Sequence, residues 1–219
     1  MIHIFDVDNT VIKRNSAWYF LCEALSGGVV RLSHLRRLPF EWLAYKCGRP
    51  NMDFIEETVK HLAGIDQSVL EKTAKVGFER RIKPNIYIGA AKLISDALER
   101  GERVIFATSS FQTIVQPLEQ FLAVHGCLAS DLEFKDGKTT GKLVGGSLFG
   151  AKKKIAVQAW LEENNLLPAD VRCYSDSYTD IPVLELCGKP VAVNPDRILA
   201  KEAKKRGWEI MRFSETLEK

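Results

Sequence analysis

The sequence predicts an α/β fold with a mostly parallel sheet and an inserted, wholly helical segment. From about residue 84 onward, short apolar runs that end in polar turns alternate with stretches of helical periodicity. Such alternation is typical of parallel sheets that are covered by helices on both faces. Residues 13–83, before that alternation, have helical spacing and no strand pattern. A length of 219 residues is enough for one large domain with such an insertion.

The chain opens with the first predicted strand. Ile2–Phe5 is apolar and runs directly into Asp6-Val7-Asp8-Asn9-Thr10. Because side chains alternate along an extended chain, Asp6 and Asp8 are expected on the same side of it. Two carboxylates held this close need a cation or a shared proton, and Mg²⁺ accepts such ligands while keeping positions open for a phosphate. The alternative interpretation is that these residues only shape a turn.

The predicted helical insertion follows this turn. Apolar spacing indicates helices over about residues 16–25 and 29–45, and Asn51 or Asp53, and then Asp66, are candidate caps for two more. The stretch 31–42 mixes arginines with leucines and aromatic residues. That composition fits an ordinary packed helix or, alternatively, contact with an anionic lipid surface.

The remaining elements alternate regularly. The pattern predicts helices that end near residues 100, 122, 164, 186 and 206, strands over 103–107, 171–174, 190–193 and 208–211, and a hairpin over 131–144. Polar turns follow three of the strands, at 6–10, 108–110 and 175–180. Ligands of parallel sheets bind beyond the carboxyl ends of the strands. The three turns are therefore expected to meet in one site, which the helical insertion can cover as a lid.

Composition and charge exclude several classes of protein. A formal net charge of +3 is too small to indicate nucleic-acid binding, and no run approaches the roughly 18 apolar residues of a membrane span. The first residues lack the features of a secretory signal. The five cysteines are scattered and never spaced C-x-x-C, which predicts thiols in a reducing cytoplasm and neither a disulfide framework nor a zinc site. The sequence does not indicate an oligomeric state.

Four stretches resemble the ordered motifs of phosphatases in the haloacid dehalogenase (HAD) superfamily. These are 6–10, the strand end at Thr108, Lys153 within 150–154, and 175–180. The tail through Ala192-Val193-Asn194-Pro195-Asp196 is similar to subfamily IB, the phosphoserine-phosphatase-like branch. The resemblance implies a HAD-type, Rossmann-like core of residues 1–12 and 84–219, with a helical cap of the C1 type at 13–83.

The resemblance also implies the roles of the reacting residues. Asp6 would be the nucleophile that forms an aspartyl-phosphate, and Asp8 the general acid and then the base. Thr108 and the backbone N–H of Ser109 would bind the phosphoryl group, and Lys153, favoured over its neighbouring lysines, would neutralise phosphoryl charge. Dehalogenases of the superfamily lack an acid at the position of Asp8, so a phosphotransferase or phosphatase is expected.

A magnesium site follows from the same resemblance. Asp6, Asp176 and the backbone carbonyl of Asp8 would bind Mg²⁺, and Asp180 would orient these groups. The cation is needed because a phosphate monoester dianion repels a carboxylate nucleophile.

The substrate expected from this resemblance is a small-molecule phosphate ester. Phosphoserine phosphatases carry a glutamate for the substrate ammonium nine residues after the nucleophile, where this chain has Asn15. Phosphoserine is therefore disfavoured, and Asn15 is a candidate substrate-binding residue. The alternatives are a lipid-phosphate phosphatase of the phosphatidylglycerophosphate type, a phosphomutase, and a non-catalytic phosphate-binding module. Membrane contact is not expected, but the first alternative would require it.

Overall fold

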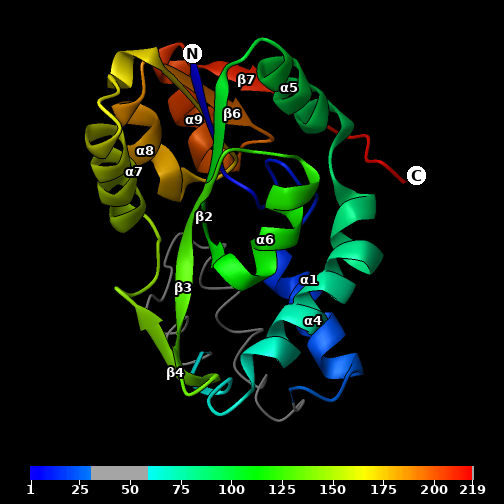
Figure 1. The fold of residues 1–219 in the computed structure, drawn as a ribbon. Coiled ribbons are helices and arrows are strands. Elements are labelled where there is room, and N and C mark those ends of the chain that lie inside the picture. Colours follow the sequence, from blue (N-terminus) through cyan, green and yellow to red (C-terminus); the bar gives the residue numbers. More distant parts are fainter. Residues whose placement is uncertain (31–58, 219) are drawn as a thin grey trace.

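The computed structural model describes residues 1–30 and 59–218, and a seven-stranded sheet lies at its centre (Figure 1). The strand order is β4-β3-β2-β1-β5-β6-β7, and all neighbouring strands are parallel except β3 and β4. The predicted α/β class with a mostly parallel sheet is confirmed. The strands are β1 (Ile2–Phe5), β2 (Arg103–Phe111), β3 (Cys127–Lys135), β4 (Lys138–Val144), β5 (Val171–Ser175), β6 (Lys189–Val193) and β7 (Glu209–Met211).

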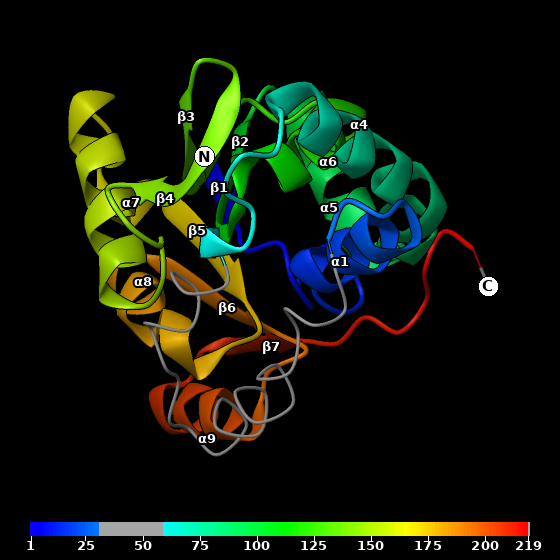
Figure 2. The ribbon, with the colours of Figure 1, turned by 90° about the horizontal axis from the view of Figure 1, so that it is seen from below.

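Helices cover both faces of this sheet. Figure 2, seen from the side of the carboxyl ends of the central strands, shows α7, α8 and α9 on one face and α5 and α6 on the other. No helix within the described ranges is long and apolar enough to cross a membrane. The helices are α1 (Ser16–Ser26), α4 (Gln67–Gly77), α5 (Ile88–Glu99), α6 (Gln112–Phe121), α7 (Ala151–Glu163), α8 (Ile181–Leu186) and α9 (Arg197–Arg206). Shorter turns are the π-helix η2 (Phe78–Ile82) and the 3₁₀ turns η3 (Lys83–Asn85), η4 (Pro168–Asp170) and η5 (Tyr178–Asp180).

The central strand β1 contributes to the apolar cores on both faces. Ile2 and Ile4 pack in the core formed with α7, α8 and α9, whereas Phe5 belongs to the core on the face of α5 and α6. The Phe5 ring stacks on Tyr174 of the neighbouring strand β5, with ring centroids 4.0 Å apart. Because β1 is covered on both faces and paired on both edges, the residue that follows it, Asp6, has a fixed position.

One strand differs from its prediction in a way that affects the site. β2 continues to Phe111, so Thr108, Ser109 and Ser110 lie within the strand and not in a turn after residue 107. The pairing register with β3 shifts between Ala107 and Phe111. An irregularity of this kind re-aims side chains while the strand continues, and the hydroxyl-rich sequence gave no indication of it.

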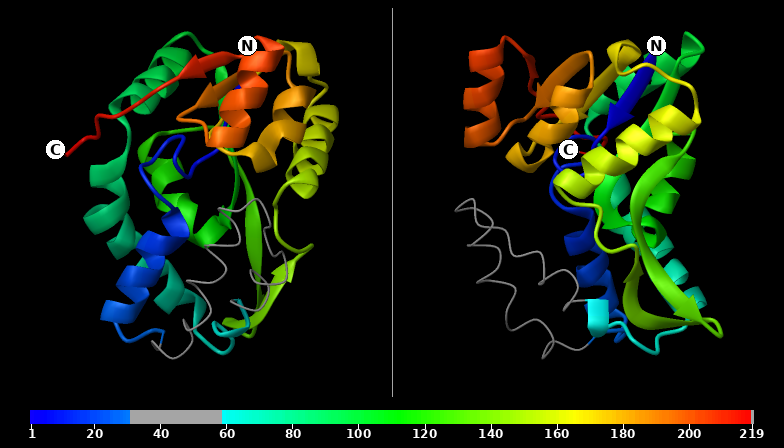
Figure 3. Two further views of the ribbon diagram at one scale, coloured as in Figure 1. Left: turned by 180° about the vertical axis from the view of Figure 1, so that it is seen from behind. Right: turned by 90° about the vertical axis from the view of Figure 1, so that its left-hand side faces the viewer.

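The β3–β4 hairpin forms as predicted, and it contacts residues 64–67. Asp136 and Gly137 connect the strands with positive φ angles of 52° and 75°, as a two-residue hairpin turn requires. The hairpin exchanges backbone hydrogen bonds with residues 64–67, from Gly64 N to Thr139 O, from Thr139 N to Ile65 O and from Gln67 N to Gly137 O, at 2.7, 2.9 and 2.9 Å. Figure 3 shows the hairpin extending from the sheet on the same side as α1 and α4.

The described part of residues 13–83 is helical, as predicted, in α1, α4 and η2. The expected helix over 29–45, the start of the one capped at Asn51 or Asp53, and the basic stretch 31–42 fall largely or wholly outside the described residues. Asp66 occupies the N-cap position of α4, but its side chain makes no capping hydrogen bond.

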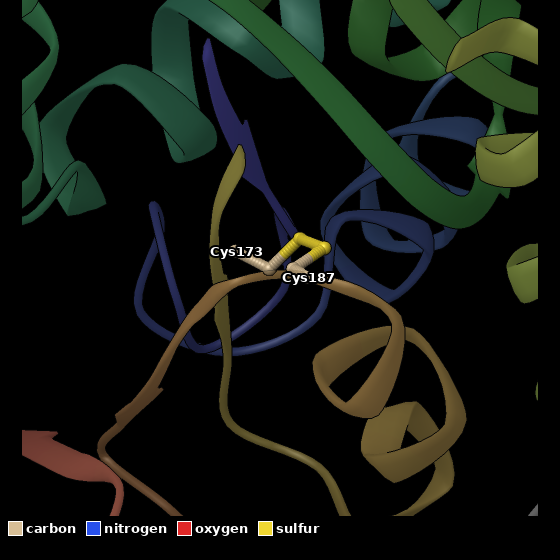
Figure 4. The surroundings of a disulfide bond; sticks show 2 residues. All are labelled: Cys173 and Cys187. Carbon is tan, nitrogen blue, oxygen red and sulfur yellow. A yellow bond between two sulfur atoms is a disulfide. The ribbon is translucent and has the colours of Figure 1, made fainter. Parts of the chain in front are cut away.

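The prediction of unpaired cysteines was wrong for two residues. Cys173 on β5 and Cys187 at the end of α8 form a disulfide (Figure 4). The topology brings residues 14 positions apart to a Cα separation of 6.1 Å, which a disulfide can span. This spacing is not a recognisable motif, so the sequence alone did not reveal the pair. Cys22 and Cys127 are free thiols.

Candidate active site

A buried lysine joins two of the predicted carboxylates at the carboxyl end of the sheet. Lys153 Nζ lies 2.8 Å from Oδ1 of Asp6 and 2.7 Å from Oδ2 of Asp180. All three side chains are buried. Asp180 also accepts a hydrogen bond from Ser175 Oγ at 2.7 Å. The strand β1, the helix α7 and the turn after β5 thus meet at one point.

The lysine in this contact is the one that the sequence favoured. Helix α7 begins at Ala151, and its first turn presents three consecutive lysines. Lys153 points inward and is 4% exposed, whereas Lys152 is exposed to solvent and Lys154 is half-buried. Burying a lysine without a partner is costly, so its ion pairs with Asp6 and Asp180 stabilise this orientation.

The second aspartate after β1 is held by the first residues of α1. Oδ1 of Asp8 accepts the backbone N–H of Ser16 at 2.8 Å, and Oδ2 accepts from Nδ2 of Asn15 at 2.7 Å. Asn15 is the N-cap of α1, and its Oδ1 accepts the backbone N–H of Trp18 at 3.0 Å. The structure therefore places Asn15 next to Asp8, with both ends of its amide engaged.

Strand β2 carries the hydroxyl groups of the second motif. Thr108 is fully buried, and its Oγ1 accepts the backbone N–H of Ser110 at 3.1 Å. Ser110 is linked to the start of α1, because Ser16 Oγ donates to Ser110 Oγ at 2.8 Å. The backbone carbonyl of Ser109 accepts from Ser130 on β3 at 3.0 Å. These bonds fix β2 against β3 and against the first residue of α1.

The loop after β5 positions Asp176 through its backbone. Asp196, the N-cap of α9, donates its backbone N–H to the carbonyl of Asp176 at 2.8 Å. The Asp196 carboxylate accepts the backbone N–H of Tyr178 at 2.7 Å and those of Ile198 and Leu199 at 2.9 and 2.8 Å. Asp196 therefore links α9 to the two peptide groups that follow Asp176.

The carboxylates crowd one another electrostatically. Burial raises the pKa of Asp6 to about 7, with Lys153 opposing the shift and the carboxylates of Asp180 and Asp8 adding to it. Burial, and then the charge of Asp6, also raise the pKa of Asp176 well above its ordinary value. Burial raises the pKa of Asp8, and the hydrogen bonds from Ser16 oppose that rise.

The lysine has the opposite electrostatic balance. Burial favours its neutral amine, but Asp180 and Asp6 outweigh that effect, so the pKa of Lys153 lies above its ordinary value. The lysine therefore stays charged. Its single positive charge does not relieve the repulsion among Asp6, Asp8 and Asp176.

This donor set fits a hard divalent cation. No three His, Cys, Asp or Glu side chains of residues 1–30 and 59–218 are already arranged around a metal position. Mg²⁺ does not need such a cage, because it typically uses one or two carboxylates and keeps several waters. Asp6 and Asp176 could supply these carboxylates. Burial raises the pKa of both, their mutual repulsion adds to the rise, and a bound cation would relieve that repulsion.

Several residues of the site were not singled out from the sequence. Ser16, Ser110, Ser175 and Asp196 each bond a predicted residue or its loop. Serines are common at helix starts and strand ends, so the residue type alone does not indicate a role in the site. Asp196 followed by a helical run does indicate an N-cap, but its contact with the Asp176 loop depends on the tertiary arrangement.

Comparison with known proteins agrees with this geometry. Residues 4–185 match the family model of haloacid dehalogenase-like hydrolases. A protein of Mycobacterium tuberculosis (strain H37Rv) named phosphoserine phosphatase is 30% identical, over 95% of this chain and 70% of its own length. The histidinol-phosphatase of Neisseria meningitidis serogroup C is 28% identical, over 96% of this chain and 97% of its own. A crystal structure of a Bordetella pertussis protein of unknown function has a TM-score of 0.84 at 25% identity, covering 96% of this chain and 97% of that one.

Proposed function

Because the chain belongs to the haloacid dehalogenase-like hydrolase family and is a phosphatase of that family, we propose that it is a Mg²⁺-dependent phosphomonoester hydrolase that works through an aspartyl-phosphate on Asp6. The observation that carries this proposal is the contact of Lys153 with Asp6 and Asp180, beside a separately held Asp8. A buried carboxylate paired with a buried ammonium is suited to attack an anionic phosphoryl group, because the lysine offsets the repulsion.

In the first half-reaction, a carboxylate oxygen of Asp6 attacks phosphorus and the bond from phosphorus to the ester oxygen breaks. Asp8 donates a proton to the leaving oxygen. Thr108 and the backbone N–H of Ser109 bind the phosphoryl oxygens, and Lys153 neutralises their charge. Mg²⁺, held by Asp6, Asp176 and the backbone carbonyl of Asp8, would supply the further positive charge that the phosphoryl group needs.

In the second half-reaction, Asp8 acts as a base. Its carboxylate takes a proton from water, the water oxygen attacks phosphorus, and the bond to Asp6 breaks to release phosphate. Asp8 therefore ends protonated, ready for the next leaving group. The two donors on Asp8 hold the carboxyl in one plane through both steps.

We assign residues 13–83 to a cap over a core formed by 1–12 and 84–219. Support comes from α1, which begins beside Asp8, and from the hydrogen bonds between residues 64–67 and the β3–β4 hairpin. The proposed location is the cytoplasm, where thiols would reduce the disulfide between Cys173 and Cys187.

The proposed substrate is a small phosphorylated metabolite, with histidinol phosphate placed ahead of phosphoserine. The relative named histidinol-phosphatase matches over 97% of its length. The residue at position 15 is an uncharged asparagine whose oxygen already accepts the Trp18 N–H, so it does not reproduce the glutamate contact of phosphoserine phosphatases. Histidinol phosphate also carries an ammonium, so the ranking of the two esters rests on the named relative and not on Asn15.

The test is a panel of phosphate esters assayed by phosphate release, with and without EDTA. The panel contains histidinol phosphate, phosphoserine, glycerol phosphate, glucose 6-phosphate and phosphatidic acid in vesicles. We expect a Mg²⁺-dependent preference for a small ester, and an acid-stable mass increase of one phosphoryl group on the peptide that contains Asp6. Activity that survives thorough chelation, or the absence of any phospho-enzyme, would contradict the proposal. A preference for vesicles would favour a lipid-phosphate phosphatase.

A further inference from the structure

The start of helix α1 is built against the carboxyl group of Asp8. Both oxygens of Asp8 accept hydrogen bonds from consecutive residues, Oδ2 from the Asn15 side chain at 2.7 Å and Oδ1 from the Ser16 backbone at 2.8 Å. Two donors on two oxygens fix both the position and the rotation of the carboxyl plane. The group that would exchange protons with the substrate is thus held by the residues that open the helix.

The orientation of the Asn15 amide follows from its second contact. Its Oδ1 accepts the backbone N–H of Trp18 at 3.0 Å, as an N-cap should. An N–H donor requires an oxygen opposite it, so the nitrogen of the amide must face Asp8. The amide is therefore engaged at both ends, with its donor directed at the carboxylate.

The helix start is in turn fixed to the phosphoryl-binding strand. Ser16 is fully buried, and its Oγ donates to Ser110 Oγ at 2.8 Å. The backbone N–H of Ser110 donates to Thr108 Oγ1 at 3.1 Å. This chain of bonds gives Asn15 a rigid support, which a residue needs if it is to orient another.

From this geometry we infer that Asn15 is a positioning residue for Asp8, and that it does not select the substrate. The inference rests on the proposed function, because it takes Asp8 as the general acid. It replaces the expectation that position 15 reads the substrate. Asn15 holds the Asp8 carboxyl where its proton can reach the leaving oxygen, and thereby couples proton transfer to the first turn of the cap.

The test separates loss of the donor from loss of the cap. Asn15→Ser keeps a good N-cap side chain but removes the amide donor to Asp8. Ser26→Ala, at the other end of α1, removes one side-chain hydrogen bond far from Asp8 and is the matched control. If Asn15→Ser does not fold, Asn15→Asp keeps the size and the capping oxygen and also lacks the donor.

The readout is the dependence of kcat/KM on the leaving group, because kcat/KM reports the first half-reaction and does not contain the hydrolysis of the aspartyl-phosphate, in which Asp8 acts as the base. Since general-acid catalysis contributes ~10²–10⁴-fold, we expect Asn15→Ser to lose ~10–100-fold with an alkyl phosphate and only a fewfold with p-nitrophenyl phosphate. The p-nitrophenolate leaving group needs little protonation, so its release in the first half-reaction does not depend on the placement of Asp8. Ser26→Ala should keep the wild-type ratio between the two esters.

Two results would overturn the inference. Equal losses on both esters would mean that Asn15 supports the fold only. A change confined to KM, and only for amine-bearing substrates, would mean that Asn15 reads the substrate. The proposed function fails by a different observation, namely turnover by Asp6→Asn or the absence of an aspartyl-phosphate, so the two claims are tested separately.

Discussion

The two acidic loops of the site are both supported by helix N-caps, but in different ways. Asn15, the cap of α1, bonds the side chain of Asp8. Asp196, the cap of α9, bonds the two peptide groups that follow Asp176 and leaves the Asp176 carboxylate to other partners. A proton-transfer group needs its carboxyl fixed in direction, whereas a metal ligand needs its main chain placed and its oxygens available. The difference matches the two proposed roles.

The largest loss of activity should follow from replacing Lys153, which contacts Asp6 of the first loop and Asp180 of the second. We expect Lys153→Met to lower kcat for p-nitrophenyl phosphate by at least ~10²-fold, because the phosphoryl charge loses its main protein partner. Removing one member of a buried ion pair should also lower the free energy of unfolding, by about 3 kcal/mol in urea denaturation.

The matched control for this variant is Lys152→Met in the same turn of α7. Its side chain is exposed, so activity should change by no more than about twofold. Comparable losses in both variants would show that the helix, and not the contact of Lys153, matters.

The next effect sharpens the comparison of the two caps. Asp196→Ala should weaken Mg²⁺ binding by ~10-fold, as other changes behind a metal ligand do, while the ratio of kcat/KM between alkyl and p-nitrophenyl esters stays unchanged. Direct Mg²⁺ titration by calorimetry and the activity ratio are the measurements. Asp66→Ala is the control, because Asp66 occupies an N-cap position without a capping hydrogen bond. If Asp196→Ala changed the ratio of kcat/KM between the alkyl and p-nitrophenyl esters, the Asp176 loop would also affect proton transfer, and the two loops would not have separate roles.

The smallest effect on catalysis is expected at the disulfide. Cys173 and Cys187 connect β5 to the end of α8, on the core side of the site. Because the bond closes a short loop, Cys187→Ala should lower the free energy of unfolding by about 3 kcal/mol. The ratio of kcat/KM between alkyl and p-nitrophenyl esters should not change. Cys22→Ala, which removes a free thiol, should keep wild-type stability. If a reducing agent leaves the wild-type unfolding curve unchanged, the disulfide does not contribute.

The sequence predicted the positions of the site residues that lie on regular elements or directly after them. Asp6 and Asp8 follow an apolar run, and Lys153 takes the inward position of a short helix turn, so periodicity and motif order were sufficient. The continuation of β2 through Thr108 was missed because it depends on a register shift against β3. The disulfide was missed because its two cysteines meet only through tertiary packing.

Asn15 shows what hydrogen-bond partners add to a role that the sequence suggests. Its place in the motif order suggested contact with a substrate, because the matching glutamate of relatives has that role. The structure shows its amide turned to Asp8 and to the helix backbone. The motif order predicted that Asn15 lies near the site, but its contacts with Asp8 and Trp18 became known only from the structure.

The most direct test of the account compares Asp6→Asn with Asp8→Asn in rapid mixing with p-nitrophenyl phosphate. Asp8→Asn keeps the nucleophile, so we expect one equivalent of p-nitrophenol in a burst, followed by stalled turnover because the base for the water is missing. Asp6→Asn should give no burst. A burst from Asp6→Asn, or normal turnover by both variants, would contradict the assignment of nucleophile and acid on which the account rests.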